Sequence, residues 1–249
     1  MCELPETDPL LRTKQLWGER TVDRWKDKRV AVFGVGGVGG AAVEALMRSG
    51  IGHFTLIDGD TVSPTNLNRQ IIAARDTLGR RKVDCFAERI ASVFPDTVCE
   101  TLPLFFLPGE KESDAIDFSR FDYVIDAVDT VAAKVEIIRR ATEAGVPVIS
   151  AMGAGRKRDP MGFICTDLSK TDTDPLAKAV RLALRRIGIT HCKVVFSREI
   201  PAEQACGDGE SVKNGTRRSP GSDACVPAAA GLLIASTVLR ELAQNDSTK

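Results

Sequence analysis

A glycine-rich turn and a downstream acid carry the clearest chemistry in this sequence. The stretch "GVGGVG" places Gly34, Gly36, Gly37 and Gly39 after an apolar run and at the start of a helical pattern. Such a turn brings backbone N–H groups and the positive end of a helix close to phosphate, and Asp58 can accept hydrogen bonds from ribose hydroxyls. The pattern predicts a nucleotide site, and the alternative is a tight packing turn without a ligand.

The polar loop that follows separates two classes of nucleotide. "DGDTVSPTNLNRQ" contains Asp60, Asn66 and Arg69, and Lys82 begins the next helical pattern. Arg can hold phosphate oxygens in a bidentate fashion and Asn can orient them, whereas hydride transfer needs a flat apolar slot for nicotinamide. Lys82 is either a second cation for the same phosphates or part of a solvated basic turn. The loop therefore favours a nucleoside triphosphate over a redox dinucleotide.

Two acids follow a third apolar run, in "YVIDAVDTVAAK". They are Asp126 and Asp129, and we expect them at the carboxyl end of a buried strand, where open α/β sheets bind ligands. Mg²⁺ takes one or two carboxylates together with substrate phosphates, so Asp129 is the expected metal ligand. The alternative is that Asp129 only caps the following helix.

The elements that must position these residues follow from the hydrophobic pattern. Short apolar runs alternate with longer helical patterns, which predicts an α/β fold with a mainly parallel central sheet and helices on both faces. Two late runs, "FICTDLS" and "CKVVFSRE", are expected to be antiparallel strands on one edge. The other expected strands are Arg29–Gly34, Phe54–Asp58, Thr97–Leu102, Asp122–Ala127 and Pro147–Ala151, and the expected helices are Val38–Ser49, Arg80–Phe94, Val131–Ala144, Leu176–Ile187 and Ala228–Ala243.

The composition of the chain bears on whether it binds a polyanion, structural zinc or a membrane. The 34 basic residues equal the 34 acidic ones, so any contact with a polyanion must use a local patch. The seven cysteines are irregularly spaced and form no Cys-x-x-Cys pair, which predicts reduced thiols and no structural zinc. The polar N-terminal stretch is unlike a signal peptide, and no apolar run approaches the roughly 20 residues of a spanning helix. We therefore expect a cytoplasmic protein with no membrane partner.

Basic residues concentrate in the second half of the chain, where they could form such a patch. Residues 203–222 are also rich in Gly, Ser and charge, which predicts a mobile loop, either a connector or a functional lid. The alternative for the basic residues is a set of solvated helix faces and a soluble loop. They are Arg156, Lys157, Arg158, Lys178, Arg181, Arg185, Arg186, Lys193, Lys213, Arg217 and Arg218.

Taken together, these motifs resemble the ubiquitin-activating-enzyme-like superfamily, which includes the bacterial adenylating proteins ThiF, MoeB and HesA. The similarity extends over nearly the full length, including "LLRTKQLWGERTVDRWKDKRVAVFGVGGVGG" and "TLIDGDTVSPTNLNRQ". Within the superfamily, "TDLSKTDTDPLAK" and "VFSRE" are most similar to the bacterial branch that dehydrates threonylcarbamoyladenosine in tRNA. The missing Cys-x-x-Cys pairs, with which sulfur-carrier activators usually hold zinc, favour the same branch.

The resemblance implies a Rossmann-like adenylating fold that uses ATP and Mg²⁺. Residues 1–28 would be an N-terminal helical arm, and residues 29–249 a single ATP-binding domain. Arg12 would reach the site of a partner subunit in a homodimer, or would be an ordinary charge on an amphipathic helix. The implied roles are phosphate binding for Gly34, Gly36, Gly37 and Gly39, nucleotide binding for Asp58 and Asp60, triphosphate binding and catalysis for Asn66, Arg69 and Lys82, catalysis for Arg12, and magnesium binding and catalysis for Asp129.

The implied reaction is adenylation of the threonine carboxylate of threonylcarbamoyladenosine in tRNA, followed by ring closure with net loss of water. A first alternative is a sulfur-carrier adenylyltransferase that activates the C-terminal glycine of a ubiquitin-like protein. A second is an NAD-dependent oxidoreductase. The attacking ring atom, the tRNA set, cooperating sulfur-transfer or redox proteins, and an acyl intermediate on Cys165 or Cys225 stay open.

Overall fold

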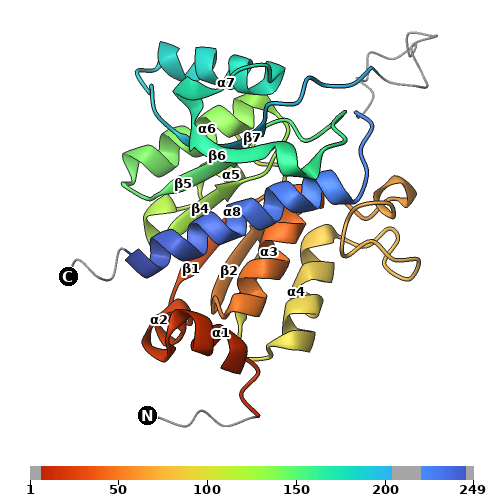
Figure 1. The fold of residues 1–249 in the computed structure, drawn as a ribbon, viewed down its shortest axis with the longest axis vertical. Coiled ribbons are helices and arrows are strands. Elements are labelled where there is room, and N and C mark those ends of the chain that lie inside the picture. The colour runs from red at the N-terminus through yellow and green to blue at the C-terminus, as the bar shows by residue number, and fades with distance from the viewer. Residues whose placement is uncertain (1–6, 204–219, 245–249) are drawn as a thin grey trace.

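A seven-stranded sheet with helices on both faces forms the body of the protein (Figure 1). The computed structural model describes residues 7–203 and 220–244. The strand order is β3-β2-β1-β4-β5-β7-β6, and each neighbouring pair is parallel except β6 with β7. The strands are β1 (Arg29–Phe33), β2 (His53–Ile57), β3 (Val98–Leu102), β4 (Tyr123–Asp126), β5 (Val148–Ala151), β6 (Phe163–Asp167) and β7 (Lys193–Ser197).

The helices divide between the two faces of this sheet. The long helix α8 lies along α3 on one face, next to α4, while α6 and α7 pack together on the other (Figure 1). The helices are α1 (Leu11–Trp17), α2 (Glu19–Trp25), α3 (Gly37–Ser49), α4 (Lys82–Val93), α5 (Lys111–Asp114), α6 (Val131–Glu143), α7 (Pro175–Arg186) and α8 (Cys225–Gln244).

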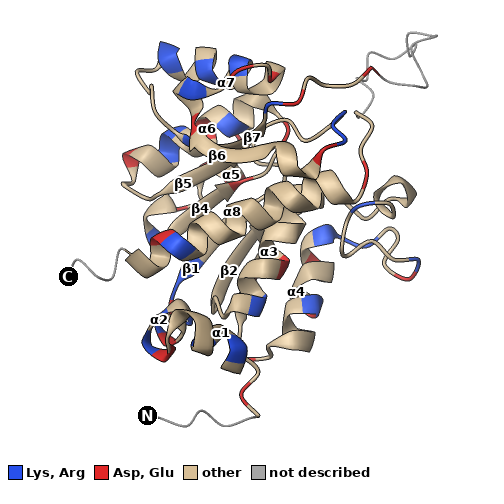
Figure 2. Cartoon of the chain, viewed as in Figure 1, with Lys and Arg blue, Asp and Glu red and all other residues tan. Residues whose placement is uncertain are grey.

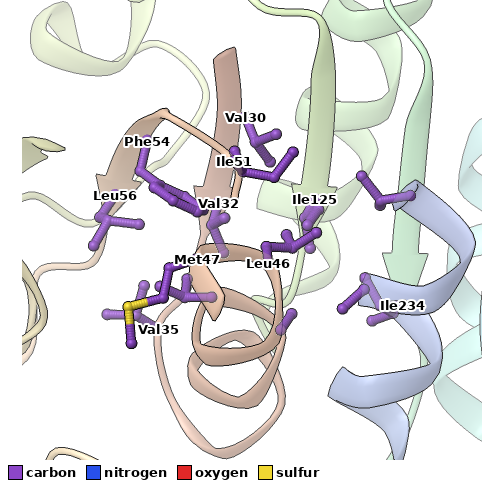
Figure 3. Close-up of a cluster of buried hydrophobic side chains, with 14 of the residues drawn as sticks. Val30, Val32, Val35, Leu46, Met47, Ile51, Phe54, Leu56, Ile125 and Ile234 are labelled. Carbon is purple, nitrogen blue, oxygen red and sulfur yellow. The ribbon is translucent and has the colours of Figure 1, made fainter. Parts of the chain in front are cut away.

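The central strand β1 shows why its sequence is a continuous apolar run. Successive side chains on a strand point to opposite faces of the sheet, and both faces are covered here. Val32 packs with Leu46 and Ile234 in one core cluster (Figure 3), whereas its neighbour Phe33 packs with Ile137 in a second cluster. The strand is therefore fixed between two hydrophobic layers, and its carboxyl end is held rigidly.

The strands and helices expected from the sequence are all present, with ends that differ by three residues or fewer. The two late strands pair antiparallel with each other at one edge of the sheet, as expected, and the structure adds the direction of β7 relative to β5. β7 pairs in parallel with β5, with Ile149 opposite Lys193. The reason is the reversal of the chain at β6: a strand antiparallel to β6 must run in the direction of β5. The short helix α5 was not predicted.

The helix α8 is long and apolar enough, by length and composition, to cross a membrane. In the fold it is a core helix, because 56% of its most apolar window is buried inside the protein. Gly231 permits the close packing on α3, since a Cβ at that position would lie 2.2 Å from the carbonyl oxygen of Val38. Its apolar composition is thus explained by burial against α3 and the sheet.

Candidate active site

The glycine turn and the downstream acids gather at one edge of the sheet. Because β1, β2, β4 and β5 are parallel, the segments that follow them emerge on the same side. We call this side the carboxyl edge. It is the side at which open α/β sheets bind their ligands.

The turn between β1 and α3 requires its glycines for steric reasons. Gly34 has a φ of +83°, and a Cβ there would lie 2.8 Å from the carbonyl oxygen of Ala127 at the end of β4. A Cβ on Gly39 would lie 1.8 Å from the carbonyl oxygen of Gly34. Gly36 precedes α3 without any side-chain cap, so the first N–H groups of that helix are available to a phosphate.

Asp58 links the glycine turn to the polar loop. Its Oδ2 accepts a hydrogen bond of 2.8 Å from the backbone N–H of Val35, and its Oδ1 accepts one of 2.9 Å from that of Asp60. Burial raises the pKa of Asp58, while the nearby charge of Lys82 and the two backbone donors act in the opposite direction. The carboxylate retains lone pairs for ribose hydroxyls, so it can fix the turn and bind a nucleotide at the same time.

Lys82 is the first residue of α4 and is largely buried, with 5% of its surface exposed. Its Nζ lies 2.7 Å from Oδ2 of Asp60, whose side chain is about half exposed. The ammonium group is therefore held near Asp58 at the carboxyl edge and not in a solvated turn. This position supports its interpretation as a phosphate ligand.

Asn66 and Arg69 come from the polar loop after β2. Asn66 is buried at the end of a short 3-10 turn, and its Oδ1 accepts a hydrogen bond of 3.0 Å from the N–H of Ser63. Arg69 donates to the carbonyl oxygen of Thr65 at 2.8 Å, and its Cγ would lie 3.7 Å from a Cβ on Gly37. The loop thus places Arg69 against the first turn of α3, and Asn66 stabilises the loop.

Gln70 is a residue of this site that the sequence did not reveal. It is 92% buried, and among residues 7–203 and 220–244 its Oε1 has no hydrogen-bond partner. Its Nε2 would lie 3.5 Å from a Cβ on Gly36. An unsatisfied buried amide is costly, so this orphan beside an open glycine turn fits a polar ligand such as ATP. The one signal for it was its place directly after Arg69.

The two acids after β4 have different environments. Asp126 is fully buried, and its carboxylate contacts Nζ of Lys134 at 3.0 Å and the hydroxyl of Ser150. Asp129 is exposed, and Thr130, not Asp129, is the N-cap of α6. Asp126 is therefore committed to a buried ion pair, whereas Asp129 has no ion pair with a described residue and can face a ligand.

A single carboxylate matches the expected metal. The described part of the chain contains no group of three or more His, Cys, Asp and Glu side chains that could hold a metal ion. Mg²⁺ does not need such a group, because it takes one or two carboxylates and completes its shell with phosphate oxygens and water. Asp129 at the carboxyl edge fits that requirement.

Arg12 lies apart from the other predicted site residues. It is exposed on α1, and its guanidinium donates to the side chain of Gln15 at 3.3 Å. The α1–α2 arm packs where β2 begins, with the N–H of Gly52 bonded to the carbonyl oxygen of Trp25 (Figure 1). Arg12 is therefore separated from its own glycine turn by about the length of a strand, roughly 17 Å for five residues.

Gly221 and Ser222, at the end of the glycine- and serine-rich segment, connect two loops at the carboxyl edge. The carbonyl oxygen of Ser222 accepts from Nδ2 of Asn68 at 2.9 Å, and that of Gly221 accepts from the N–H of Arg156 at 2.8 Å. The polar loop after β2 is thereby linked to the loop after β5. Most of the predicted mobile loop, including Lys213, Arg217 and Arg218, lies outside the described residues.

Known proteins are similar in sequence to this chain over nearly its whole length. A model of the ThiF family matches residues 9–249. The tRNA threonylcarbamoyladenosine dehydratase of Bacillus subtilis is 40% identical over 240 residues, which cover 93% of each chain. The Escherichia coli protein of the same name is 40% identical over 174 residues, 70% of this chain and 64% of the relative.

The fold is shared as well. The crystal structure of E. coli tRNA N6-threonylcarbamoyladenosine dehydratase, TcdA, in complex with AMP superposes with a TM-score of 0.85 at 31% identity, covering 99% of this chain and all of the other. Its complex with ATP gives 0.84 at 32% identity, with the same coverage. The glycine turn, the polar loop and the sheet are thus found together with a full-length family match. This chain belongs to the ThiF family.

Proposed function

We propose that the protein is an ATP-dependent dehydratase that cyclises threonylcarbamoyladenosine in tRNA. The observation that carries the proposal is its 40% identity to the B. subtilis dehydratase over 93% of both chains. The arrangement of the carboxyl edge supports it, because an open glycine turn, two cations and a free carboxylate suit a triphosphate with its metal.

The chemistry explains why ATP is needed. A carboxylate is a poor electrophile, and ATP supplies an adenylyl group that activates the threonine carboxylate, with pyrophosphate as the leaving group. The N–H groups of the turn, Arg69 and Lys82 would bind and orient the phosphates, and Asp58 would accept from the ribose. The carbamoyl group of the same nucleoside then attacks the activated carbonyl, and positioning alone gives this closure a high effective molarity.

The atom balance of this reaction is a dehydration. One carboxyl oxygen leaves with AMP, and two protons are lost, one from the carboxylic acid when it ionises and one from the carbamoyl group, so the nucleoside counted as its free acid loses the elements of water. No external nucleophile is required, and neither Cys165 nor Cys225 is assigned a role.

Three further features belong to the proposal. Asp129 would hold Mg²⁺ against the phosphates, because it is an exposed carboxylate at this edge that has no ion pair with a described residue, whereas Asp60 is paired with Lys82. Arg12 would serve the site of the partner in a homodimer, because its own site is out of reach. The protein would work in the cytoplasm, where its tRNA substrate is found, with residues 29–249 as one ATP-binding domain.

Mass spectrometry of tRNA nucleosides tests the activity directly. After incubation of modified tRNA with the protein, ATP and Mg²⁺, we expect threonylcarbamoyladenosine to lose the mass of one water. Omission of ATP should leave the nucleoside unchanged. Unaltered nucleoside in the complete reaction, with correctly folded protein, contradicts the proposal.

One relative supports a second candidate function. The E. coli molybdopterin-synthase adenylyltransferase is 34% identical over 125 residues, half of this chain. ATP–pyrophosphate exchange separates the two activities. Stimulation by a small protein ending in Gly-Gly, and not by modified tRNA, would establish sulfur-carrier activation in place of tRNA dehydration.

A further inference from the structure

The neutral chain has an uneven distribution of charge. Residues 156–199 hold ten Lys and Arg but only five Asp and Glu, whereas the rest of the chain holds 24 and 29. This positive part comprises the exits of β5 and β7 together with β6 and α7, and α7 itself carries four basic residues and no acidic one (Figure 2). A polyanion would therefore be attracted to one side of the molecule.

The acids in this part mainly satisfy backbone groups. Asp159, Asp167 and Asp174 each accept a hydrogen bond of 2.8 to 3.0 Å from a backbone N–H two or three residues ahead. Glu199 accepts from the backbone N–H groups of Arg158 and Asp159. These carboxylates stabilise turns and the start of α7, and among the described Lys and Arg side chains only Lys157 forms an ion pair with one of them, Asp174.

Most Lys and Arg side chains between residues 156 and 199 have no ion pair with a described residue. Elsewhere several arginines at or near the surface are paired, as Arg48 and Arg89 are with Glu44 and Arg139 is with Glu136. Between 156 and 199, Lys157, Arg181 and Lys193 have partners. The other cations there are exposed and lack an ion pair with any described residue, and we call them the basic surface: Arg156, Arg158, Lys170, Lys178, Arg185, Arg186 and Arg198.

A buried tie holds part of this surface at the carboxyl edge. Nζ of Lys157 donates to the carbonyl oxygen of Ser197 at 2.8 Å and lies 3.6 Å from Oδ2 of Asp174, which in turn accepts from the N–H of Gly153. The hydroxyl of Thr173 donates to the carbonyl oxygen of Arg198 at 3.2 Å. The loops after β5 and β7 and the start of α7 are thus fixed together, and they carry Arg156, Arg158 and Arg198.

The surface continues along α7. Ala177, Val180 and Leu184 are buried against the core, so Lys178 and Arg185 lie on the exposed face. Seven residues of helix separate these two cations by about 10 Å along the axis. The row therefore begins beside the ATP site and leads away from it.

We infer that the basic surface binds the phosphate backbone of an RNA, and that the tRNA lies along α7 while its modified base reaches the carboxyl edge. The inference rests on the proposed function for the identity of the RNA. Cations spread over three loops and a helix beside a nucleotide site suit an extended phosphate backbone. Such binding gains affinity from counterion release and is strongly weakened by salt.

The test removes three cations of α7 at once. The variant Lys178→Gln, Arg185→Gln, Arg186→Gln is compared with a matched control, Arg48→Gln, Lys111→Gln, Arg240→Gln, which loses the same charge from exposed positions on α3, α5 and α8. tRNA affinity is measured by fluorescence anisotropy over a range of salt concentrations. We expect the α7 variant to bind tRNA at least tenfold more weakly and its log–log salt slope to fall by about 2, since each lost phosphate contact contributes roughly 0.7 to 0.9.

Three readouts complete the experiment. The control variant should bind tRNA as the wild type does, and both variants should keep wild-type ATP affinity and melting temperature. Unchanged tRNA affinity and salt slope in the α7 variant would overturn the inference, even if the wild type dehydrates tRNA. Loss of binding to vesicles containing anionic lipid, with tRNA binding intact, would instead assign the surface to a membrane and also overturn it. If the α7 variant loses tRNA binding but the wild type leaves the nucleoside unchanged, the surface stands and the proposed reaction fails.

Discussion

The carboxylate of Asp58 accepts a hydrogen bond of 2.8 Å from the backbone N–H of Val35, so the end of β2 directly holds the glycine turn. Because burial raises the pKa of Asp58, this group protonates at a higher pH in the folded protein than in the unfolded chain. We expect ATP affinity to fall as the pH drops through that raised pKa, since a protonated carboxyl accepts fewer hydrogen bonds from the turn and the ribose. Isothermal titration at a series of pH values measures the effect.

The sign of the stability effect provides the control. A carboxyl with a raised pKa favours folding most strongly in acid, and this contribution is lost as the pH rises through the raised value. Protonation of Asp58 in acid should therefore weaken ATP binding without destabilising the folded protein. The Asp58→Asn variant should lack this step in the pH profile of ATP affinity, and a profile like that of the wild type would refute the assignment.

Two glycines of the same turn should respond differently to alanine. A Cβ on Gly39 would collide with the carbonyl oxygen of Gly34, whereas a Cβ on Gly36 meets only the flexible amide of Gln70 at 3.5 Å. We expect Gly39→Ala to lower the melting temperature markedly or to prevent folding. Gly36→Ala should keep a melting temperature close to that of the wild type but weaken ATP binding, because its methyl group occupies the phosphate cradle. Equal thermal stability of the two variants would contradict this geometry.

Much of this fold was predictable because its central strands are buried on both faces. In β1 the four residues after Arg29 are buried and must all be apolar, and the helices between strands repeat their apolar residues every three or four positions. The pairing of β7 was not predictable from the pattern of that strand. Its place between β5 and β6 depends on how the chain turns back at β6, which is not a property of residues 193–197.

Substitutions at the two acids after β4 should have different effects, one on the stability of the fold and the other on catalysis. Lys134→Met would leave the buried carboxylate of Asp126 without its cation, a change that typically costs about 3 to 5 kcal/mol. Asp129→Asn alters an exposed residue and should change the free energy of unfolding by less than about 0.5 kcal/mol. Urea denaturation measures both changes. The Asp129→Asn protein should nevertheless lose ATP-dependent turnover, and unchanged activity at limiting Mg²⁺ would refute the metal role.

The same pair shows how far sequence can resolve a site. Asp126 and Asp129 stand three residues apart, and the sequence cannot show that Lys134 from the next helix reaches back to the first of them. Gln70 was missed for a related reason, because an unpartnered amide is visible only when its surroundings are known. The site role of side chains that follow a glycine turn in the sequence can be predicted. The role of a side chain that depends on a missing partner, or on a partner distant in the sequence, cannot.

The pairing of Lys82 with Asp60 predicts the effect of removing one charge. Lys82→Gln keeps an amide that can bond to the half-exposed carboxylate, so we expect little loss of stability. ATP binding should weaken roughly 10- to 150-fold, because hydrogen bonds to charged groups contribute about 1.5 to 3 kcal/mol. Nucleotide titration checks the value, with Arg80→Gln as a control, since the side chain of Arg80 pairs with Glu88 at the surface. ATP affinity equal to that of the wild type would show that Lys82 only anchors the loop.

Arg12 provides the last prediction, because its exposed position on the arm places it out of reach of its own glycine turn. If a homodimer shares its sites, the variants Arg12→Ala and Arg69→Ala are each inactive alone, but a hybrid dimer contains one complete site. Random pairing makes half of the dimers hybrids with one working site in two, so an equal mixture should recover about a quarter of wild-type activity. As a control, a mixture of Arg69→Ala and Lys82→Gln should show no recovery, since both residues belong to the same subunit's site. Full activity of Arg12→Ala alone, or no recovery in hybrids verified by native mass spectrometry, would exclude a shared site.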